Sequence, residues 1–483
     1  MPGEQVNQTN LLSNLHFDIG AARKILKVSF PLMGSMVGNL LMILVDRICL
    51  ARYSTDTLAA SGPAVFTATT IIAVFTSIVG FSRSCVAQAY GRSGEEEASH
   101  QAAIGIVIGI GFALMLVLCS PLIERIPFLS NRPANLTSLE SQFLFWAAQF
   151  TSVMTLNVAL TSYFNGIGKT RITLVVGLIG QAVTIVMTIG LVFGEFGLPE
   201  LGMRGSAIGT LIGTVSMLLC YLAWLPAPVW RKLREIAVKR DANFKSTIAL
   251  RLKQGFSLGA YSGVDTLGNT VFVWIIASLG SIALAANNID ITLNFVATVP
   301  LIGLGIGCSV LCGNALGEDD YPQIVRLLFV TLALELLYVV IVSGFEIFTP
   351  ELLLGPFGLS ERPVEIQRAS IATSRVLWVF SVAFAFSMTG SAVLESFGLT
   401  RFLFVARFVF MWLMSIPAVY FVASNHSGNA DFLPSCWVIG GVFEGLVGAA
   451  YCWRLMAAIR KRQNGIVLHP APQPASEAIP LSP

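Results

Sequence analysis

Residues 27–60 read KVSFPLMGSMVGNLLMILVDRICLARYSTDTLAA, an apolar segment long enough to cross a bilayer as a helix. One carboxylate, Asp46, lies well inside this segment. On the mildest insertion scale, a charge at the centre of a spanning helix costs about 2.5–3.5 kcal/mol. A charged group at such a depth usually faces a cavity or the interior of a helix bundle. Asp46 is therefore a candidate functional residue.

The segment has a copy that begins at Lys253, 226 residues farther along the chain. Farther on, the offset between matching residues becomes 230. The matched positions are Lys27 and Lys253, Phe30 and Phe256, Leu58 to Ala60 and Leu284 to Ala286, Ala89 and Ala315, Gly91 and Gly317, and Gly168, Thr170 and Arg171 with Gly398, Thr400 and Arg401. One half of the chain is thus a copy of the other, in the same orientation if each half has an even number of helices. A parallel duplication with a site between its halves is a transporter architecture.

The composition indicates a membrane protein. Of the 483 residues, 55% are hydrophobic and only 12% are charged, whereas soluble domains have about 25% charged residues. The net charge of +3 and the lack of a basic run with interleaved aromatic residues do not indicate a nucleic-acid partner. The eight cysteines are scattered through apolar segments, where they behave as small hydrophobic residues.

Windows of about 20 apolar residues predict an all-α polytopic membrane protein with about twelve transmembrane helices in two pseudo-symmetric six-helix lobes. The predicted spans are 25–50, 59–82, 100–124, 142–164, 172–195 and 203–226 in the first half, and 254–279, 283–312, 324–346, 370–396, 400–424 and 434–458 in the second.

Outside these spans the sequence predicts three polar segments, one at each end of the chain and one between the two lobes. They are a cytoplasmic tail at 1–24, a basic linker at 227–253 and a disordered cytoplasmic tail at 459–483, which leaves an N-lobe at 25–226 and a C-lobe at 254–458. Basic loops stay in the cytoplasm, so both termini are expected there, and we expect the membrane to be a plasma or bacterial inner membrane. The acidic triplets at 95–97 and 318–320 are expected to cap the helices that follow them.

Several stretches resemble the MATE (multidrug and toxic compound extrusion) transporters of the MOP superfamily, nearest to their NorM and DinF groups. They cover both halves in order, and together they are far more specific than any one alone. The stretches are VDRICLARYSTDTLAASGPA at 45–64, VAQAYGRSGEE at 86–96, YFNGIGKTR at 163–171, FGLPELGMRGSAIGT at 196–210, LGSIALAANNI at 279–289 and GNALGEDD at 313–320.

The resemblance implies a secondary active antiporter. Two six-helix lobes would surround a central cavity, and inward movement of sodium ions or protons would drive amphipathic, often cationic, organic compounds outward by alternating access. It implies a small-molecule substrate and contact with membrane lipid, with no cofactor, no nucleic acid and no enzymatic activity. We expect a monomer.

In the N-lobe, Asp46 matches the first-helix acid that the family uses as a cation or proton site. The alternative is that Asp46 pairs with Arg47 or extends toward the outer surface. Thr184 and Thr188 occupy positions where the family often has an Asn and an Asp, so a second carboxylate is missing. Neutral oxygens could replace it, and the candidates are Asn39, Asn157, Thr161 and Gln181.

In the C-lobe, Asp265 is the copy of Asn39 and matches the family's acid of the seventh helix, usually a Glu. Asp265 could form a cation site with Asn288 and Asp290 of the eighth span, with sodium held by the two aspartates. The alternative is a buried polar network that joins two helices. Glu335 and Glu444 are further intramembrane acids, and for these we favour structural hydrogen bonding.

Other functions fit the sequence less well, among them a pure receptor or scaffold, which would not need duplicated lobes with intramembrane acids. A flippase or exporter of a lipid-linked saccharide, or of one dedicated metabolite, is the main alternative. A flippase of this kind would need Arg and Lys along its cavity, and the spans contain few. A membrane-embedded enzyme is disfavoured because the four histidines lie near span ends or in loops and no catalytic motif is present.

Overall fold

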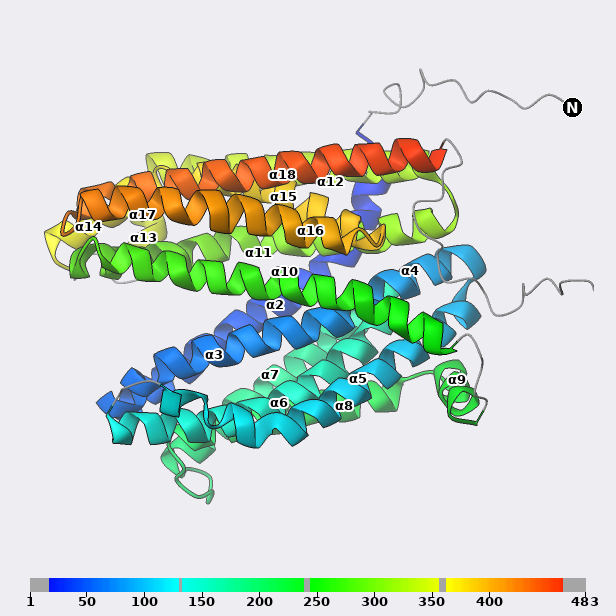
Figure 1. Ribbon diagram of the computed structural model, residues 1–483, viewed down its shortest axis with the longest axis horizontal. Helices are drawn as coiled ribbons and strands as arrows, with labels where there is room; N and C mark the ends of the chain where they lie inside the picture. The colour runs from blue at the N-terminus through cyan, green and yellow to red at the C-terminus, as the bar shows by residue number, and fades with distance from the viewer. Residues whose placement is uncertain (1–16, 130–132, 239–243, 356–361, 464–483) are drawn as a thin grey trace, which may run out of the picture. The chain divides into compact units, whose positions relative to one another are not determined.

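The computed structural model describes residues 17–129, 133–238, 244–355 and 362–463. In these ranges every regular element is a helix (Figure 1). The helices are α2 Ile19–Tyr53, α3 Thr55–Gly80, α4 Ser82–Ser93, α5 Glu95–Ile123, η1 Ile126–Leu129, α6 Ala134–Gly166, α7 Thr170–Phe193, α8 Met203–Trp224, α9 Ala227–Val238, α10 Phe244–Ala277, α11 Ser281–Gly317, α12 Tyr321–Phe348, α13 Pro350–Leu354, α14 Val364–Ser374, α15 Leu377–Ser396, α16 Thr400–Arg407, η4 Phe408–Ser415, α17 Ile416–Asn425, η5 Ala430–Phe432 and α18 Leu433–Gln463.

Eleven helical segments in the described ranges are long and apolar enough to cross a membrane. The remaining predicted span, 254–279, lies in α10, which contains Asp265 and Asn269 and is not among these eleven segments. The helices extend beyond the predicted spans: α2 begins at Ile19, and the second span continues through α4 to Ser93. Of the two predicted tails, residues 1–16 and 464–483 lie outside the described ranges.

The helices form two compact units, which we call unit 1 and unit 2. In the described ranges, unit 1 contains residues 17–33 and 268–463, and unit 2 contains residues 34–267. These boundaries differ from the predicted lobes because they cut two helices in the middle. The first part of α2 belongs with the second half of the sequence, and most of α10 belongs with the first half.

Close helix packing explains the first of these boundaries. In unit 1, a Cβ atom built on Gly307 of α11 would lie 2.0 Å from Oγ of Ser29, and one built on Gly303 would lie 2.4 Å from Cγ of Met33. Real Cβ atoms do not approach other atoms so closely, so the two glycines let the first part of α2 pack directly on α11.

A close helix contact at a glycine is also present in unit 2. A Cβ atom on Gly255 of α10 would lie 2.6 Å from the carbonyl oxygen of Ile78 on α3. The hydroxyl oxygens of Ser77 and Ser262 are 2.6 Å apart on the same two helices. Gly255 is the copy of Ser29 at the offset of 226 residues, so the glycine lies on α11 in one unit and on α10 in the other.

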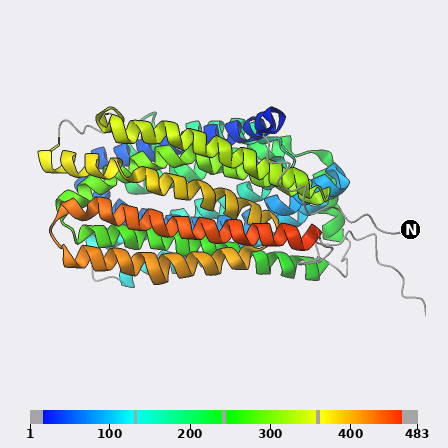
Figure 2. The same cartoon turned by 90° about the horizontal axis from the view of Figure 1, so that it is seen from above.

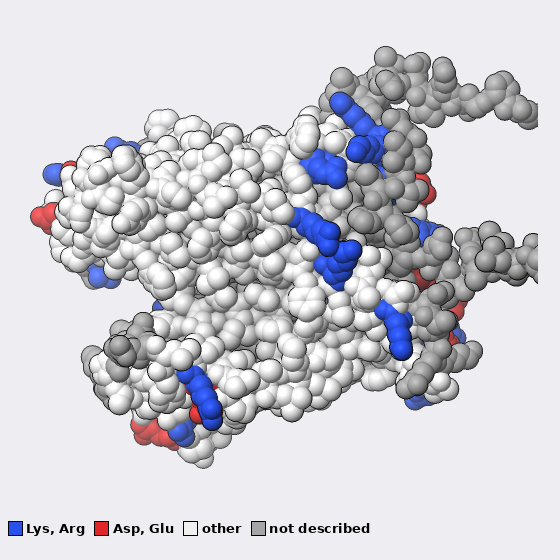
Figure 3. Space-filling model, viewed as in Figure 1, with Lys and Arg blue, Asp and Glu red and all other residues white. Residues whose placement is uncertain are grey.

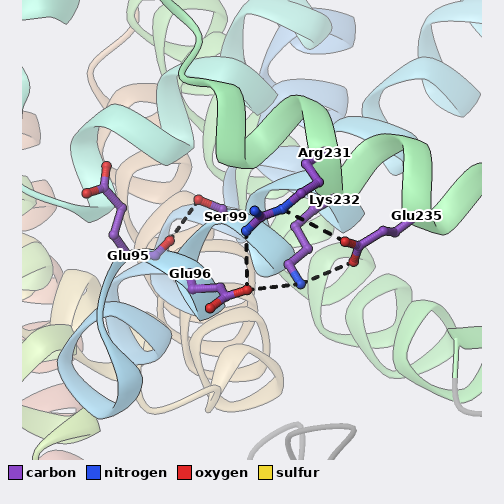
Figure 4. Close-up of polar contacts among 6 residues, drawn as sticks. All are labelled: Glu95, Glu96, Ser99, Arg231, Lys232 and Glu235. Atoms are coloured by element: carbon purple, nitrogen blue, oxygen red, sulfur yellow. Dashed lines mark hydrogen bonds and ion pairs between the residues drawn. The ribbon is translucent and has the colours of Figure 1, made fainter.

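The predicted basic linker is largely helical in its described residues. Val229 of α9 is fully buried, whereas the side chain of Arg231 is 61% exposed. Arg231 and Lys232 each lie 3.4 Å from Oε1 of Glu96 at the start of α5, and Lys232 also pairs with Glu235 at 3.1 Å (Figure 4). The helix is therefore an amphipathic connector that is tied to α5 by ion pairs.

Both acidic triplets lie beside the start of the next helix, and the predicted side-chain cap is present in the second of them. Glu95 to Glu97 form the first turn of α5. Oδ1 of Asp320 accepts a hydrogen bond of 3.0 Å from the backbone N–H of Gln323, which makes Asp320 the N-cap of α12. On the face in Figure 3, charged side chains lie mostly toward the helix ends, and a broad uncharged surface covers the helices between them.

Candidate functional site

Asp46 is held within unit 2 by a hydroxyl group. Its Oδ1 accepts a short hydrogen bond from Oγ of Ser206, a buried residue on α8. Asp46 is half-buried, whereas Arg47 is exposed, because successive side chains point about 100° apart around a helix. Ser206 was missed in the sequence, although it lies in the stretch at 196–210 and directly follows Gly205. Asp46 therefore faces the interior of unit 2 and has a neutral partner.

Thr184 and Thr188, which are predicted to replace an Asn and an Asp, lie in the contact between α7 and α8. A Cβ atom on Gly213 would lie 1.8 Å from Oγ1 of Thr184, and one on Gly209 would lie 2.7 Å from Oγ1 of Thr188. Thr184 donates a hydrogen bond of 2.9 Å to the carbonyl oxygen of Gly180. Both threonines thus fill the groove that the glycines of α8 leave, and a coupling role for them stays a prediction.

Two buried amides supply candidate neutral oxygens in unit 2. Nδ2 of Asn157 donates to the carbonyl oxygen of Thr214 at 2.9 Å, and Nε2 of Gln181 donates to that of Ser35 at 2.9 Å. In both residues the side-chain oxygen is buried and accepts no hydrogen bond from the described residues. Asn39, in contrast, is exposed. The amide oxygens of Asn157 and Gln181 could therefore accept from a proton donor or contact a cation.

The predicted C-lobe set does not gather in one unit. Asp290 is 0% exposed in α11 of unit 1. Asn288 is exposed, because a separation of two residues places the side chains about 200° apart around the helix. Asp265 is half-buried and belongs to the part of α10 in unit 2. A cation site made of all three residues stays a prediction, and the burial of Asp290 supports only that residue.

The surroundings of Asp290 are polar but sparse. Ser370 and Thr373 of α14 are its nearest hydroxyl neighbours. Neither carboxyl oxygen reaches hydrogen-bonding geometry with a described residue. One turn earlier, Oδ1 of Asn287 accepts a hydrogen bond of 3.0 Å from Nε1 of Trp437. Because a buried carboxylate without donors is unfavourable, Asp290 is suited to bind a proton or a cation.

Two more buried acids in unit 1 lie on opposite sides of α15. Glu444 of α18 accepts from Arg407 and from Ser387, both at short range. Glu335 of α12 contacts Thr389, whose Oγ1 lies 2.7 Å from Oε1 and 2.9 Å from Oε2. Among the described residues, no group of three or more His, Cys, Asp and Glu side chains is placed to hold a metal ion.

Arg407 was missed as a site residue in the sequence. The signal was a single basic residue between two apolar runs in the eleventh span, which usually indicates an intramembrane partner of opposite charge. The hydroxyls of Ser387 and Thr389 carried no such signal, because serine and threonine are frequent in membrane helices.

The MatE family model matches the chain twice, at residues 31–189 and 264–421. The chain belongs to the MATE family. The two matches correspond to the two halves of the sequence, which confirms the internal duplication. They also cover the helices that carry Asp46, Thr184, Thr188, Asp265, Asp290, Glu335 and Arg407.

Curated relatives and solved structures agree with the family assignment. The chain is 21% identical over 413 residues to a probable multidrug resistance protein NorM of Thermotoga maritima, covering 82% of this chain and 85% of the relative. It is 24% identical to the multidrug resistance protein NorM of Burkholderia vietnamiensis, covering 83% and 87%. The structure of a MOP superfamily transporter from Pyrococcus furiosus matches with a TM-score of 0.80 and 18% identity, covering 95% of this chain and all of that one. These matches confirm the predicted all-α fold of two six-helix lobes.

The duplication of this MATE chain allows its contacts to be compared between units. At the offset of 226, Glu335 is the copy of Gly109, and at the offset of 230, Thr389 is the copy of Ala159. A Cβ atom on Gly109 would lie 3.0 Å from Cβ of Ala159, so these two residues also meet. The contact between α5 and α6 is therefore apolar at this place, whereas the corresponding contact between α12 and α15 contains an acid and a hydroxyl.

A second pair of contacts corresponds in the same way. Ser387 and Glu444 are the copies of Asn157 and Thr214, at the offset of 230. Both pairs form a hydrogen bond, with an amide and a backbone carbonyl in unit 2 and a hydroxyl and a carboxylate in unit 1. The second half of this MATE protein thus has buried acids where the first half has neutral groups.

Proposed function

We propose that this chain is a secondary active antiporter that exports amphipathic, often cationic, organic compounds in exchange for sodium ions or protons by alternating access. The observation that carries the proposal is the family match over both halves of the chain, together with an acid inside the first helix. The relatives named multidrug resistance protein NorM support the same substrate class.

Asp46 is the proposed coupling residue of the first half. In its ionised form the carboxylate attracts a sodium ion or a proton, and Ser206 donates to it. Binding of the coupling ion neutralises the carboxylate. The carboxylate then no longer attracts the cationic substrate, which can dissociate. Thr184, Thr188 and Asn39 are proposed to contribute polar groups to this part of the protein, and Asp290 is proposed as the coupling acid of the second half.

The proposed location is a cell membrane with both termini in the cytoplasm. The support is the basic character of α9 and the residues that follow it, because loops rich in Lys and Arg are retained on the cytoplasmic side. α9 lies between the sixth and seventh spans, so an even number of crossings separates it from both ends of the chain.

Purified protein in proteoliposomes tests the proposal. Efflux of ethidium is measured with a sodium gradient alone and then with a pH gradient alone. The Asp46→Asn variant should lower the driven rate at least about tenfold, since it removes the charge that binds the coupling ion. Ser206→Ala should lower the rate less, because it removes one hydrogen bond and keeps the charge. Arg47→Gln is the control and should retain the wild-type rate, since Arg47 is exposed.

Two results would count against this assignment. Full ion-driven efflux by Asp46→Asn would remove Asp46 from the mechanism. A wild-type protein that moves no cation under either gradient would favour a flippase or an exporter of one metabolite. Against the flippase, the buried guanidinium groups of Arg251 and Arg407 are held by Gln101 and Glu444 within their own units, so they are not free to bind a pyrophosphate.

A further inference from the structure

Glu335 lies in the middle of α12 with a side chain that is 0% exposed. Its two carboxyl oxygens lie 2.7 and 2.9 Å from a single atom, Oγ1 of Thr389. A threonine hydroxyl has one proton to donate. Shared between both oxygens, this proton forms only a three-centre bond. A protonated carboxyl group can instead donate to Oγ1 of Thr389 while the hydroxyl donates to the other carboxyl oxygen, so that both contacts become full hydrogen bonds.

The other groups around Glu335 do not neutralise it. Cys308 faces it from α11, with its sulfur 3.7 Å from that of Cys312, and Cys452 faces it from α18. These titratable neighbours are thiols, which carry no positive charge. Within the described residues, Glu335 forms no ion pair with a Lys, Arg or His side chain. The contrast is Glu444, which has Arg407 as a buried ion-pair partner.

The same surroundings disfavour a sodium ion. Hard cations in proteins take a shell of several oxygen ligands, and in the described residues the hydroxyl that contacts the Glu335 carboxyl group is that of Thr389. The nearby hydroxyl of Thr331 donates to the carbonyl oxygen of Leu327 at 2.8 Å. The neighbouring sulfur atoms of Cys308 and Cys452 prefer softer metals. A proton is the cation that this pair of groups can hold.

The helix contact itself does not require an acid. The copies of Glu335 and Thr389 in unit 2 are Gly109 and Ala159, and these residues bring α5 and α6 together through apolar atoms alone. An acid at the corresponding place in unit 1 must be removed from water during folding, which is unfavourable. Helix packing alone therefore does not account for a buried acid at position 335, whereas proton binding does.

We propose that Glu335 and Thr389 form a proton-binding site in the second half of the chain, and that the proton is exchanged during transport. In the loaded state the carboxyl O–H donates to Oγ1 of Thr389, and the hydroxyl of Thr389 donates to the other carboxyl oxygen. On release, the carboxyl O–H bond breaks, the proton passes to water, and the electron pair stays on the carboxylate. This inference rests on the proposed antiport and identifies a proton as the ion at this site.

Infrared spectroscopy of the purified protein tests the protonation directly. A protonated carboxylic acid has a C=O band that shifts in D2O, and a carboxylate does not. The Glu335→Gln variant should lack one such band that the wild type shows at neutral pH. Its amide can form the same two hydrogen bonds with Thr389, so the variant should fold. Thr389→Val should keep the band and move it to higher frequency, because both hydrogen bonds with the hydroxyl are lost.

Glu96→Gln is the matched control for the spectrum. Glu96 is an exposed, ion-paired carboxylate, so its replacement should leave the carboxylic-acid bands unchanged. If Glu335→Gln also leaves them unchanged, Glu335 is ionised and the proposal is overturned.

Transport decides whether the proton is exchanged. Efflux driven by a pH gradient should fall at least about tenfold in Glu335→Gln. A variant that has lost the band but retains wild-type pH-driven efflux would show a static neutral acid, which also overturns the proposal. If the wild type moves no substrate under any gradient, the proposed antiport fails, and the spectrum alone decides the site. A band that disappears as the pH rises supports proton exchange there, and a band that never changes overturns it.

Discussion

The contact between α7 and α8 in unit 2 differs from its counterpart in unit 1, although the two halves are copies. In unit 2, Gly209 and Gly213 of α8 let the threonines of α7 approach closely. Their copies in α18 are Ile439 and Phe443. The copy of α7 is interrupted after Arg407 by the π-helical turn η4. In unit 1, large residues of α18 therefore face a helix that is interrupted by a π-helical segment, whereas in unit 2 the glycines of α8 face an uninterrupted α-helix.

The buried polar groups differ between the units in the same direction. The hydrogen bond between Asn157 and Thr214 joins neutral groups, whereas its counterpart in unit 1 joins Ser387 to Glu444, which also forms an ion pair with Arg407. α15 and α18 run beside each other in unit 1 (Figures 1 and 2), and their counterparts α6 and α8 pack together in unit 2. The comparison teaches that helix order can be copied while the chemistry inside each bundle diverges.

Breaking the buried ion pair should have the largest effect on stability. Arg407→Leu leaves Glu444 buried without its cation, and removal of one partner of such a pair costs about 3–5 kcal/mol. The free energy of unfolding in mixed micelles measures the loss. A triple variant, Ser387→Asn, Glu444→Thr and Arg407→Leu, gives unit 1 the neutral pair of unit 2. It should recover most of the stability, and an equal loss in both variants would contradict this account.

The glycine contact of unit 2 should give an intermediate effect. Gly213→Ala places a methyl group 1.8 Å from Oγ1 of Thr184, and overpacking of this kind costs about 1–3 kcal/mol. Adding Thr184→Ala should restore only part of the loss, because the added Cβ atom would still lie 2.8 Å from the backbone carbonyl oxygen of Gly180. Gly111→Ala is the control, because nothing lies within 4 Å of its added Cβ atom. Equal thermal stability of Gly213→Ala and Gly111→Ala would refute the tight contact.

The exposed ion pairs of α9 should matter least. Glu96→Gln removes the contacts to Arg231 and Lys232, and the side chain of Glu96 is 69% exposed. Such surface pairs contribute about 0–1 kcal/mol because water and salt screen them. Thermal unfolding should therefore hardly change. A loss of stability as large as that of Arg407→Leu would mean that exposed and buried ion pairs contribute equally to stability in this protein.

The sequence identified Asp46 because a carboxylate in an apolar span is a local signal. It also identified Glu335 and Glu444 as intramembrane acids, but it favoured a structural role and could not name their partners. Thr389 lies 54 residues from Glu335, and Arg407 lies 37 residues before Glu444. Spacing along one helix carries no information on partners at such distances, so Ser206 and Thr389 were missed.

The sequence by itself determined the all-α membrane fold, the order of the spans and the duplication. These follow from runs of apolar residues and from matching residues at constant offsets, which are properties of the chain alone. The tertiary structure decided which acids are paired and where the units divide. It placed Asp265 and Asp290 in different units and divided α2 after Met33. The physical reason is that pairing and unit boundaries depend on close approach between helices that are distant in sequence, and side-chain size at a few glycines controls that approach.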